Sequence, residues 1–107
     1  MTIGHGATAF GLSDDTLLKI RQTLAQYPQV EQALLYGSRA KGNFKPGSDI
    51  DLSLKGAQLD MGLLGDIEQS LDDLLLPYEI DLSLYAQLNH AELTAHIDRV
   101  GQVIYQR

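Results

Sequence analysis

The residues whose types and spacing suit chemistry lie near the middle of the chain. The first group is the segment Gly37-Ser38-Arg39-Ala40-Lys41-Gly42, which follows the apolar run at residues 33–36. A glycine directly after a buried strand permits a sharp turn and lets backbone N–H groups approach a ligand closely. Combined with a hydroxyl and two cations at the start of a helical turn, such N–H groups suit a polyphosphate. The segment therefore predicts a phosphate-binding turn formed by Gly37, Ser38, Arg39 and Lys41.

Three aspartates form the second group, on two predicted strands at residues 49–54 and 78–85. Because side chains alternate across a strand, Asp49 and Asp51 leave the same face, with Cα atoms about 6.5 to 7 Å apart. If the two strands pair in parallel, Asp81 stands beside Asp51 as a third source of oxygen ligands. Mg²⁺ favours such ligands and completes its shell with water and substrate phosphates. These residues therefore predict a divalent-cation site beside the phosphate-binding turn.

Each feature also has a simpler interpretation. A Gly-Ser pair after a strand is most often just a turn, and aspartates that alternate with apolar residues are most often the solvated face of an edge strand. The combination argues for a site, because aspartate is disfavoured in strands and three uncompensated carboxylates on adjacent strands repel one another. A bound cation would supply the compensation, so the residues alone favour a metal-dependent, phosphate-handling site.

The composition limits the class of protein. With 107 residues, 44% of them hydrophobic, the chain is expected to form a single domain over residues 1–107. The absence of cysteine excludes thiol chemistry and fits a cytoplasmic protein. A net charge of −6 argues against direct binding of nucleic acid. No apolar run approaches the roughly 20 residues that span a membrane, so no membrane contact is expected.

The elements that must position these residues follow from the hydrophobic periodicity. They are a loose lead-in at residues 1–12, a helix capped by Ser13 that ends before Pro28, a strand at 33–36, a loop with one helical turn at 37–47, a strand at 49–54, a helix that ends by Pro77, a strand at 78–85, and a last helix capped by Asn89 with the apolar stripe Leu93, Ile97, Val100 and Ile104. This order predicts an α/β fold with a mixed sheet of about three strands. The first two strands are expected to be antiparallel and the last two parallel.

The three histidines, His5, His90 and His96, show no mutual metal-ligand spacing. We therefore expect them to have surface roles, with His90 and His96 at the head and middle of the last helix.

The motif Gly37-Ser38, ten residues, Asp49-x-Asp51 and a later strand aspartate, Asp81, resembles the signature of the nucleotidyltransferase superfamily that includes DNA polymerase beta. More narrowly, the chain resembles the minimal nucleotidyltransferases, the MNT-type antitoxins that are paired with HEPN-domain toxins in prokaryotes. The resemblance implies a polymerase beta palm-like fold. It also implies that Gly37 and Ser38 hold nucleotide phosphates with help from Arg39 and Lys41, and that the three aspartates bind two Mg²⁺ ions.

The same resemblance implies an activity and a partner. The activity is transfer of AMP from ATP to a hydroxyl of a partner protein, with Asp81 as general base. The partner is a HEPN toxin, which this transfer silences. Because 107 residues leave little surface for an acceptor, a homo- or hetero-oligomer is expected. Two alternatives stay open: a non-catalytic antitoxin that acts by occlusion, and nucleotidyl transfer to a small molecule such as an aminoglycoside.

Overall fold

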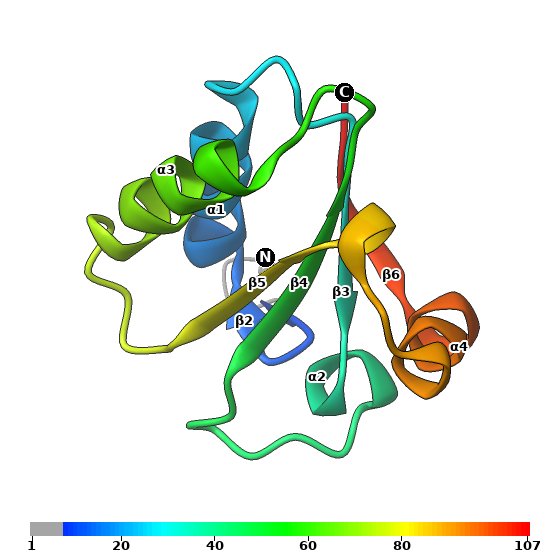
Figure 1. Ribbon diagram of the computed structural model, residues 1–107. Helices are drawn as coiled ribbons and strands as arrows, with labels where there is room; N and C mark the ends of the chain where they lie inside the picture. The colour runs from blue at the N-terminus through cyan, green and yellow to red at the C-terminus, as the bar shows by residue number, and fades with distance from the viewer. Residues whose placement is uncertain (1–7) are drawn as a thin grey trace.

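A four-stranded mixed sheet forms the centre of the computed structural model, which describes residues 8–107 (Figure 1). The strands are β3 (Gln32–Tyr36), β4 (Ile50–Lys55), β5 (Ile80–Leu84) and β6 (Gln102–Gln106), in the spatial order β5-β4-β3-β6. β3 pairs antiparallel with both β4 and β6, whereas β4 pairs in parallel with β5. The predicted α/β fold and both predicted strand pairings are confirmed. The sheet has four strands where about three were predicted.

Each of the three longer helices in residues 8–107 follows a residue whose side chain caps it. The helices are α1 (Asp14–Ala25), α2 (Ser38–Lys41), α3 (Met61–Asp72) and α4 (Ala91–Val100), with a 3-10 turn, η2 (Tyr85–Gln87), before α4. The Ser13 hydroxyl accepts a hydrogen bond from the Thr16 N–H at 3.1 Å, which confirms the predicted cap of α1. Asp60 caps α3 in the same way, through the Leu63 N–H at 2.8 Å. None of the helices within residues 8–107 has the length and apolar character to cross a membrane.

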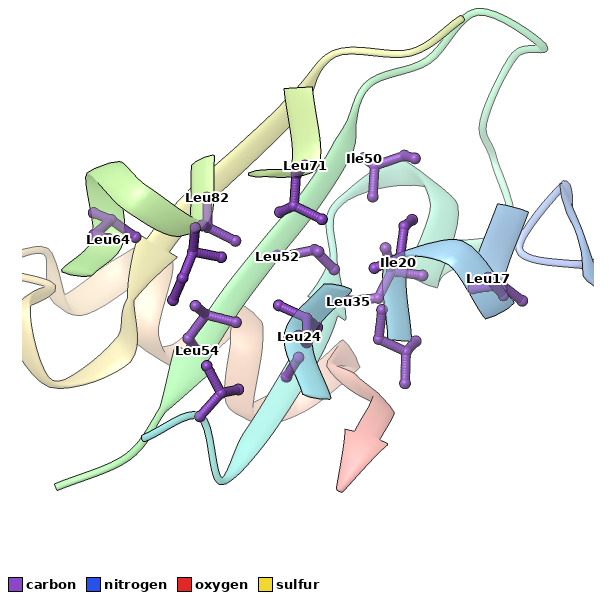
Figure 2. Close-up of a cluster of buried hydrophobic side chains, with 14 of the residues drawn as sticks. Leu17, Ile20, Leu24, Leu35, Ile50, Leu52, Leu54, Leu64, Leu71 and Leu82 are labelled. Carbon is purple, nitrogen blue, oxygen red and sulfur yellow. The ribbon is translucent and has the colours of Figure 1, made fainter. Parts of the chain in front are cut away.

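α1 and α3 cover one face of the sheet, and α4 lies on the other side (Figure 1). Figure 2 shows leucines and isoleucines of α1 and α3 meeting those of the strands. The inward side chains of β4, Ile50, Leu52 and Leu54, are at most 1% exposed. The predicted apolar side of this strand is confirmed. Burial of each such side chain stabilises the fold by about 1.5 to 3 kcal/mol, which gives the site on the other face a rigid support.

The end of the chain differs from the prediction. α4 is capped by His90, not Asn89: the imidazole Nδ1 of His90 accepts a hydrogen bond from the Leu93 N–H at 3.0 Å. The helix ends at Val100, and Gly101 is extended, so Ile104 lies in a strand and not on the helix. β-branched residues favour strands, and β3 offers a free edge whose backbone groups β6 can pair with.

The described part of the expected lead-in also has structure. Two short strands, β1 (Thr8–Ala9) and β2 (Leu12–Ser13), form an antiparallel hairpin. Gly11 in its turn has a φ of 74°, a conformation that glycine adopts readily. Leu12 is buried in the main core, and its burial stabilises the hairpin. The lead-in prediction is therefore wrong for residues 8–12, and residues 1–7 lie outside the described part of the chain.

Candidate active site

The predicted phosphate-binding turn lies between β3 and α2. Gly37 has φ 78° and ψ −155°, a backbone conformation that strongly favours glycine. A Cβ atom at this position would overlap Oδ2 of Asp51 on the neighbouring strand. The Gly37 carbonyl accepts a hydrogen bond from the Lys41 N–H at 3.1 Å, which closes the predicted helical turn. Glycine is thus required twice here, for the turn and for its close approach to Asp51.

The sheet brings two of the predicted aspartates side by side. Asp51 on β4 and Asp81 on β5 are direct partners in the parallel register, and Tyr36 on β3 faces Asp51 from the other side. The row Tyr36, Asp51 and Asp81 thus crosses three strands beside the turn at Gly37. Asp49 is exposed and directly precedes β4. The predicted placement of Asp81 beside Asp51 is confirmed.

This row carries uncompensated negative charge. Burial raises the pKa of Asp51 above its ordinary value, and the charges of Asp81 and Asp49 raise it further. Burial likewise raises the pKa of Tyr36. A hydrogen bond with Ser83 opposes this shift, whereas the nearby charges of Asp81 and Asp51 add to it. In residues 8–107 the one ion pair joins Lys19 to Asp15, so no lysine or arginine of this part neutralises the row.

The donor set fits a hard divalent cation. Carboxylate oxygens are the ligands that Mg²⁺ takes, and a cation would reverse the mutual repulsion that raises the pKa of Asp51. In the conformation described for residues 8–107, no three histidine, aspartate or glutamate side chains lie close enough together to hold a metal ion by themselves. The ligand shell would therefore need oxygens from substrate phosphates and water in addition to the aspartates.

Arg39 does not lie where the sequence analysis expected. Its side chain is 1% exposed, and it donates hydrogen bonds to the backbone carbonyls of Phe10, Pro46 and Ser48 at 2.8 to 3.1 Å. The guanidinium also lies 5.2 Å from the ring centroid of Phe44 and 4.8 Å from that of Tyr78. This corrects the expected phosphate contact, because the guanidinium already binds protein carbonyls. Arg39 instead joins the N-terminal hairpin to the loop that leads to Asp49.

Lys41 and Ser38 remain available in the segment. Lys41 is exposed at the end of α2, and Ser38 is partly exposed at its start. Both adjoin the turn beside the aspartate row. The sequence shows two cations near this turn without showing which side chain points inward, and this is why Arg39 and Lys41 were expected to act alike.

Two further groups at the site were missed by the sequence analysis. Ser53 on β4 is fully buried and takes a hydrogen bond from the Ser83 hydroxyl of β5 at 3.1 Å, which links the strands directly below the aspartates. His96 on α4 accepts a hydrogen bond from the Gly37 N–H at its Nε2, at 3.2 Å. In the sequence, only the alternation of Ser53 and Ser83 with apolar residues pointed to the hydrogen bond between them. Nothing in the spacing pointed to the contact of His96 with Gly37. The surface role expected for His96 is therefore wrong.

The family of the chain follows from a match of its sequence. The family model "Polymerase beta, Nucleotidyltransferase" matches residues 18–107, and the chain belongs to this family. The match includes the Gly37 turn and all three aspartates. A comparison with curated proteins gives no match.

Solved structures with the same fold come from toxin–antitoxin complexes. A chain of a toxin–antitoxin complex with AMP-PNP superposes with a TM-score of 0.70 at 24% identity, over 85% of this chain and 73% of that one. A chain of the MntA-HepT complex gives 0.66 at 21% identity, over 89% and 74%. A chain of a complex between tri-AMPylated Shewanella oneidensis HEPN toxin and MNT antitoxin gives 0.65 at 21% identity, over 86% and 71%. The protein thus shares the fold of these chains.

Proposed function

We propose that this protein is a Mg²⁺-dependent nucleotidyltransferase that moves AMP from ATP onto a hydroxyl of a partner protein. Membership of the family supports nucleotidyl transfer. The observation that carries the proposal is the parallel register that sets Asp51 beside Asp81, next to a turn that accepts only glycine at residue 37. In this proposal, phosphate binding and cation binding would be combined at one end of one sheet.

Each residue has a task in this reaction. The hydroxyl and N–H of Ser38 and the ammonium of Lys41 would bind and orient the triphosphate. Asp49, Asp51 and Asp81 would hold Mg²⁺, which when bound neutralises negative charge on the phosphates. The acceptor oxygen forms a bond to the α-phosphorus, and the bond from that phosphorus to pyrophosphate breaks. Asp81, an exposed carboxylate beside Asp51, would take the acceptor's proton.

The partner that fits best is a HEPN-domain toxin, which the transfer would neutralise. Complexes of HEPN toxin with MNT antitoxin share this fold, and one of those toxins is tri-AMPylated. The net charge of −6 favours a partner with a basic or polar contact surface. Because the HEPN toxin and MNT antitoxin of that structure form a complex, we propose that this protein also works in a complex, in the cytoplasm.

The test is co-expression with a HEPN-domain protein encoded beside this gene. With the wild-type protein and ATP, intact-mass spectrometry should show the partner heavier by about 329 Da for each AMP added. Asp51→Asn should still co-purify with the partner but add no AMP, because the carboxylate that pairs with Asp81 is lost. Asp72→Asn, an exposed change on α3, is the matched control and should transfer AMP normally.

One outcome would favour the non-catalytic alternative. If Asp51→Asn adds no AMP and yet protects toxin-expressing cells as well as the wild type does, occlusion is sufficient and the enzymatic explanation is wrong. If the wild type transfers AMP only to small molecules, the proposed protein acceptor is wrong.

A further inference from the structure

α4 reaches the Gly37 turn through one side chain, that of His96. Its Nε2 accepts the hydrogen bond from the Gly37 N–H, and its ring meets the Tyr36 ring edge-on, with centroids 6.2 Å apart and planes at 80°. An acceptor at Nε2 means that a neutral His96 carries its proton on Nδ1. His96 thus contacts two consecutive residues at the point where β3 becomes the turn.

Gly37 lacks a strand partner on this side of the sheet. β6 pairs with β3 only as far as Leu35 opposite Gln102, two residues before Gly37. A partly buried N–H that loses its acceptor destabilises the structure, because it gives up its contact with water without gaining a hydrogen bond in return. His96 supplies the acceptor that β6 does not extend far enough to provide, so the orientation of the Gly37 peptide depends on it.

The orientation of the Gly37 peptide affects the position of Asp51. Because a Cβ atom at residue 37 would overlap Oδ2 of Asp51, the glycine backbone lies directly against that carboxylate. Any rotation of the Gly37 peptide therefore displaces either the carboxylate or the turn that begins at Ser38. The contact of His96 with Gly37 therefore affects both the Asp51 carboxylate and the turn that begins at Ser38.

We propose that His96 is a positioning residue that holds Gly37 so that the Ser38 turn and Asp51 keep the spacing that nucleotidyl transfer needs. The inference rests on the proposed function for its effect on rate, but the contact itself is independent of that function. α4 has other anchors, namely Ile97, which packs with Leu34 and Tyr36 of β3, and a hydrogen bond from the Tyr85 hydroxyl to Asp98 at 2.5 Å. Loss of the His96 contact should therefore leave the helix in place.

The test compares His96→Leu with His96→Gln, whose side-chain oxygen can take the place of Nε2. In His96→Leu, exchange of the Gly37 amide hydrogen, followed by ¹⁵N NMR, should become faster. The rate of AMP transfer from Mg²⁺-ATP to the co-purified partner should fall about tenfold in kcat, with a much smaller change in KM, because a misplaced site loses rate more than binding. His96→Gln should restore most of both properties.

His90→Leu is the matched control, because it removes a hydrogen bond of the same helix without touching Gly37. It should lower the melting temperature and leave kcat unchanged. The proposal is overturned if Gly37 exchange is unchanged in His96→Leu, if His96→Gln is as slow as His96→Leu, or if His90→Leu lowers kcat equally.

Failure of the proposed function gives a different result. A wild-type protein that transfers no AMP to the partner refutes that function. The exchange rates of the Gly37 amide hydrogen in wild type, His96→Leu and His96→Gln would then still decide the role of His96. Equal exchange in wild type and His96→Leu would refute the positioning role as well.

Discussion

The two faces of the sheet use the same strands for opposite purposes. On the face covered by α1 and α3, β4 places Leu52, which is fully buried, whereas on the other face the preceding residue, Asp51, is only partly buried. There α4 packs on β3 through the small cluster of Leu34, Tyr36 and Ile97. The apolar face therefore stabilises the fold. The other face carries like charges, and the stability of the apolar face offsets their repulsion.

The largest effect on stability is expected from the apolar face. Leu52→Ala should lower the free energy of unfolding by about 2 to 5 kcal/mol, because it leaves a cavity in a fully buried layer. Urea denaturation measures this change. Leu18→Ala, at an apolar residue that is 51% exposed, is the control and should change stability by about 0.5 kcal/mol or less. Equal losses in the two variants would mean that the covered face is not the main source of stability.

The next largest effect is expected from Arg39, a buried polar residue near the site that contributes to stability. Arg39→Ala should lower the free energy of unfolding by about 3 kcal/mol, because it leaves the carbonyls of Phe10, Pro46 and Ser48 without their charged donor. Thermal and urea unfolding measure the loss. Arg99→Ala on exposed α4 surface should change stability by about 0.5 kcal/mol or less. If Arg39→Ala is equally mild but abolishes nucleotide binding, the phosphate contact expected from the sequence is correct after all.

The smallest effect concerns the charge of Asp51 and its dependence on pH. The folded protein has a pKa for Asp51 above the ordinary 3.8, so the folded state binds the proton more tightly than the unfolded state does. Without metal, this group should add stability as the pH falls through the raised pKa towards 3.8, and the addition should be absent above that range. In Asp51→Asn this part of the pH dependence should disappear.

Melting temperatures measured with EDTA between about pH 4 and about pH 7 provide the test. Asp72→Asn should keep the wild-type profile, because Asp72 is exposed on α3. A profile for Asp51→Asn that is the same as that of the wild type would mean that neither the burial of Asp51 nor repulsion within the aspartate row affects folding.

Much of this arrangement was predictable because alternation is a strong local signal. The order of Asp51, Leu52 and Ser53 fixes which side chains face the core, whatever the strand pairs with. The helix between β4 and β5 makes their parallel pairing the expected one, and that pairing places Asp81. The side-by-side carboxylates therefore follow from local pattern and connectivity.

The remaining features depend on contacts between distant segments. Ile104 continues the spacing of the apolar stripe on α4, and it lies in a strand because the free edge of β3 adds to the strand preference of its β-branched side chain. Arg39 is buried because Phe10 and Ser48, from two other segments, offer it their carbonyls. His96 acquires its partner because β6 stops short of Gly37. None of these contacts has a local signature in the sequence.

The order of strands in the sheet has a consequence for how the protein folds. β3 pairs with β4, the next strand of the sheet along the chain, but on its other side Gln32 pairs with Gln106, which is 74 residues away. Such long-range pairings form slowly, because closing a long loop loses chain entropy before the new contacts stabilise it. During synthesis one edge of β3 therefore stays unpaired until residue 106 has left the ribosome. Until then, the strand that leads into the Gly37 turn is open to pairing with other chains.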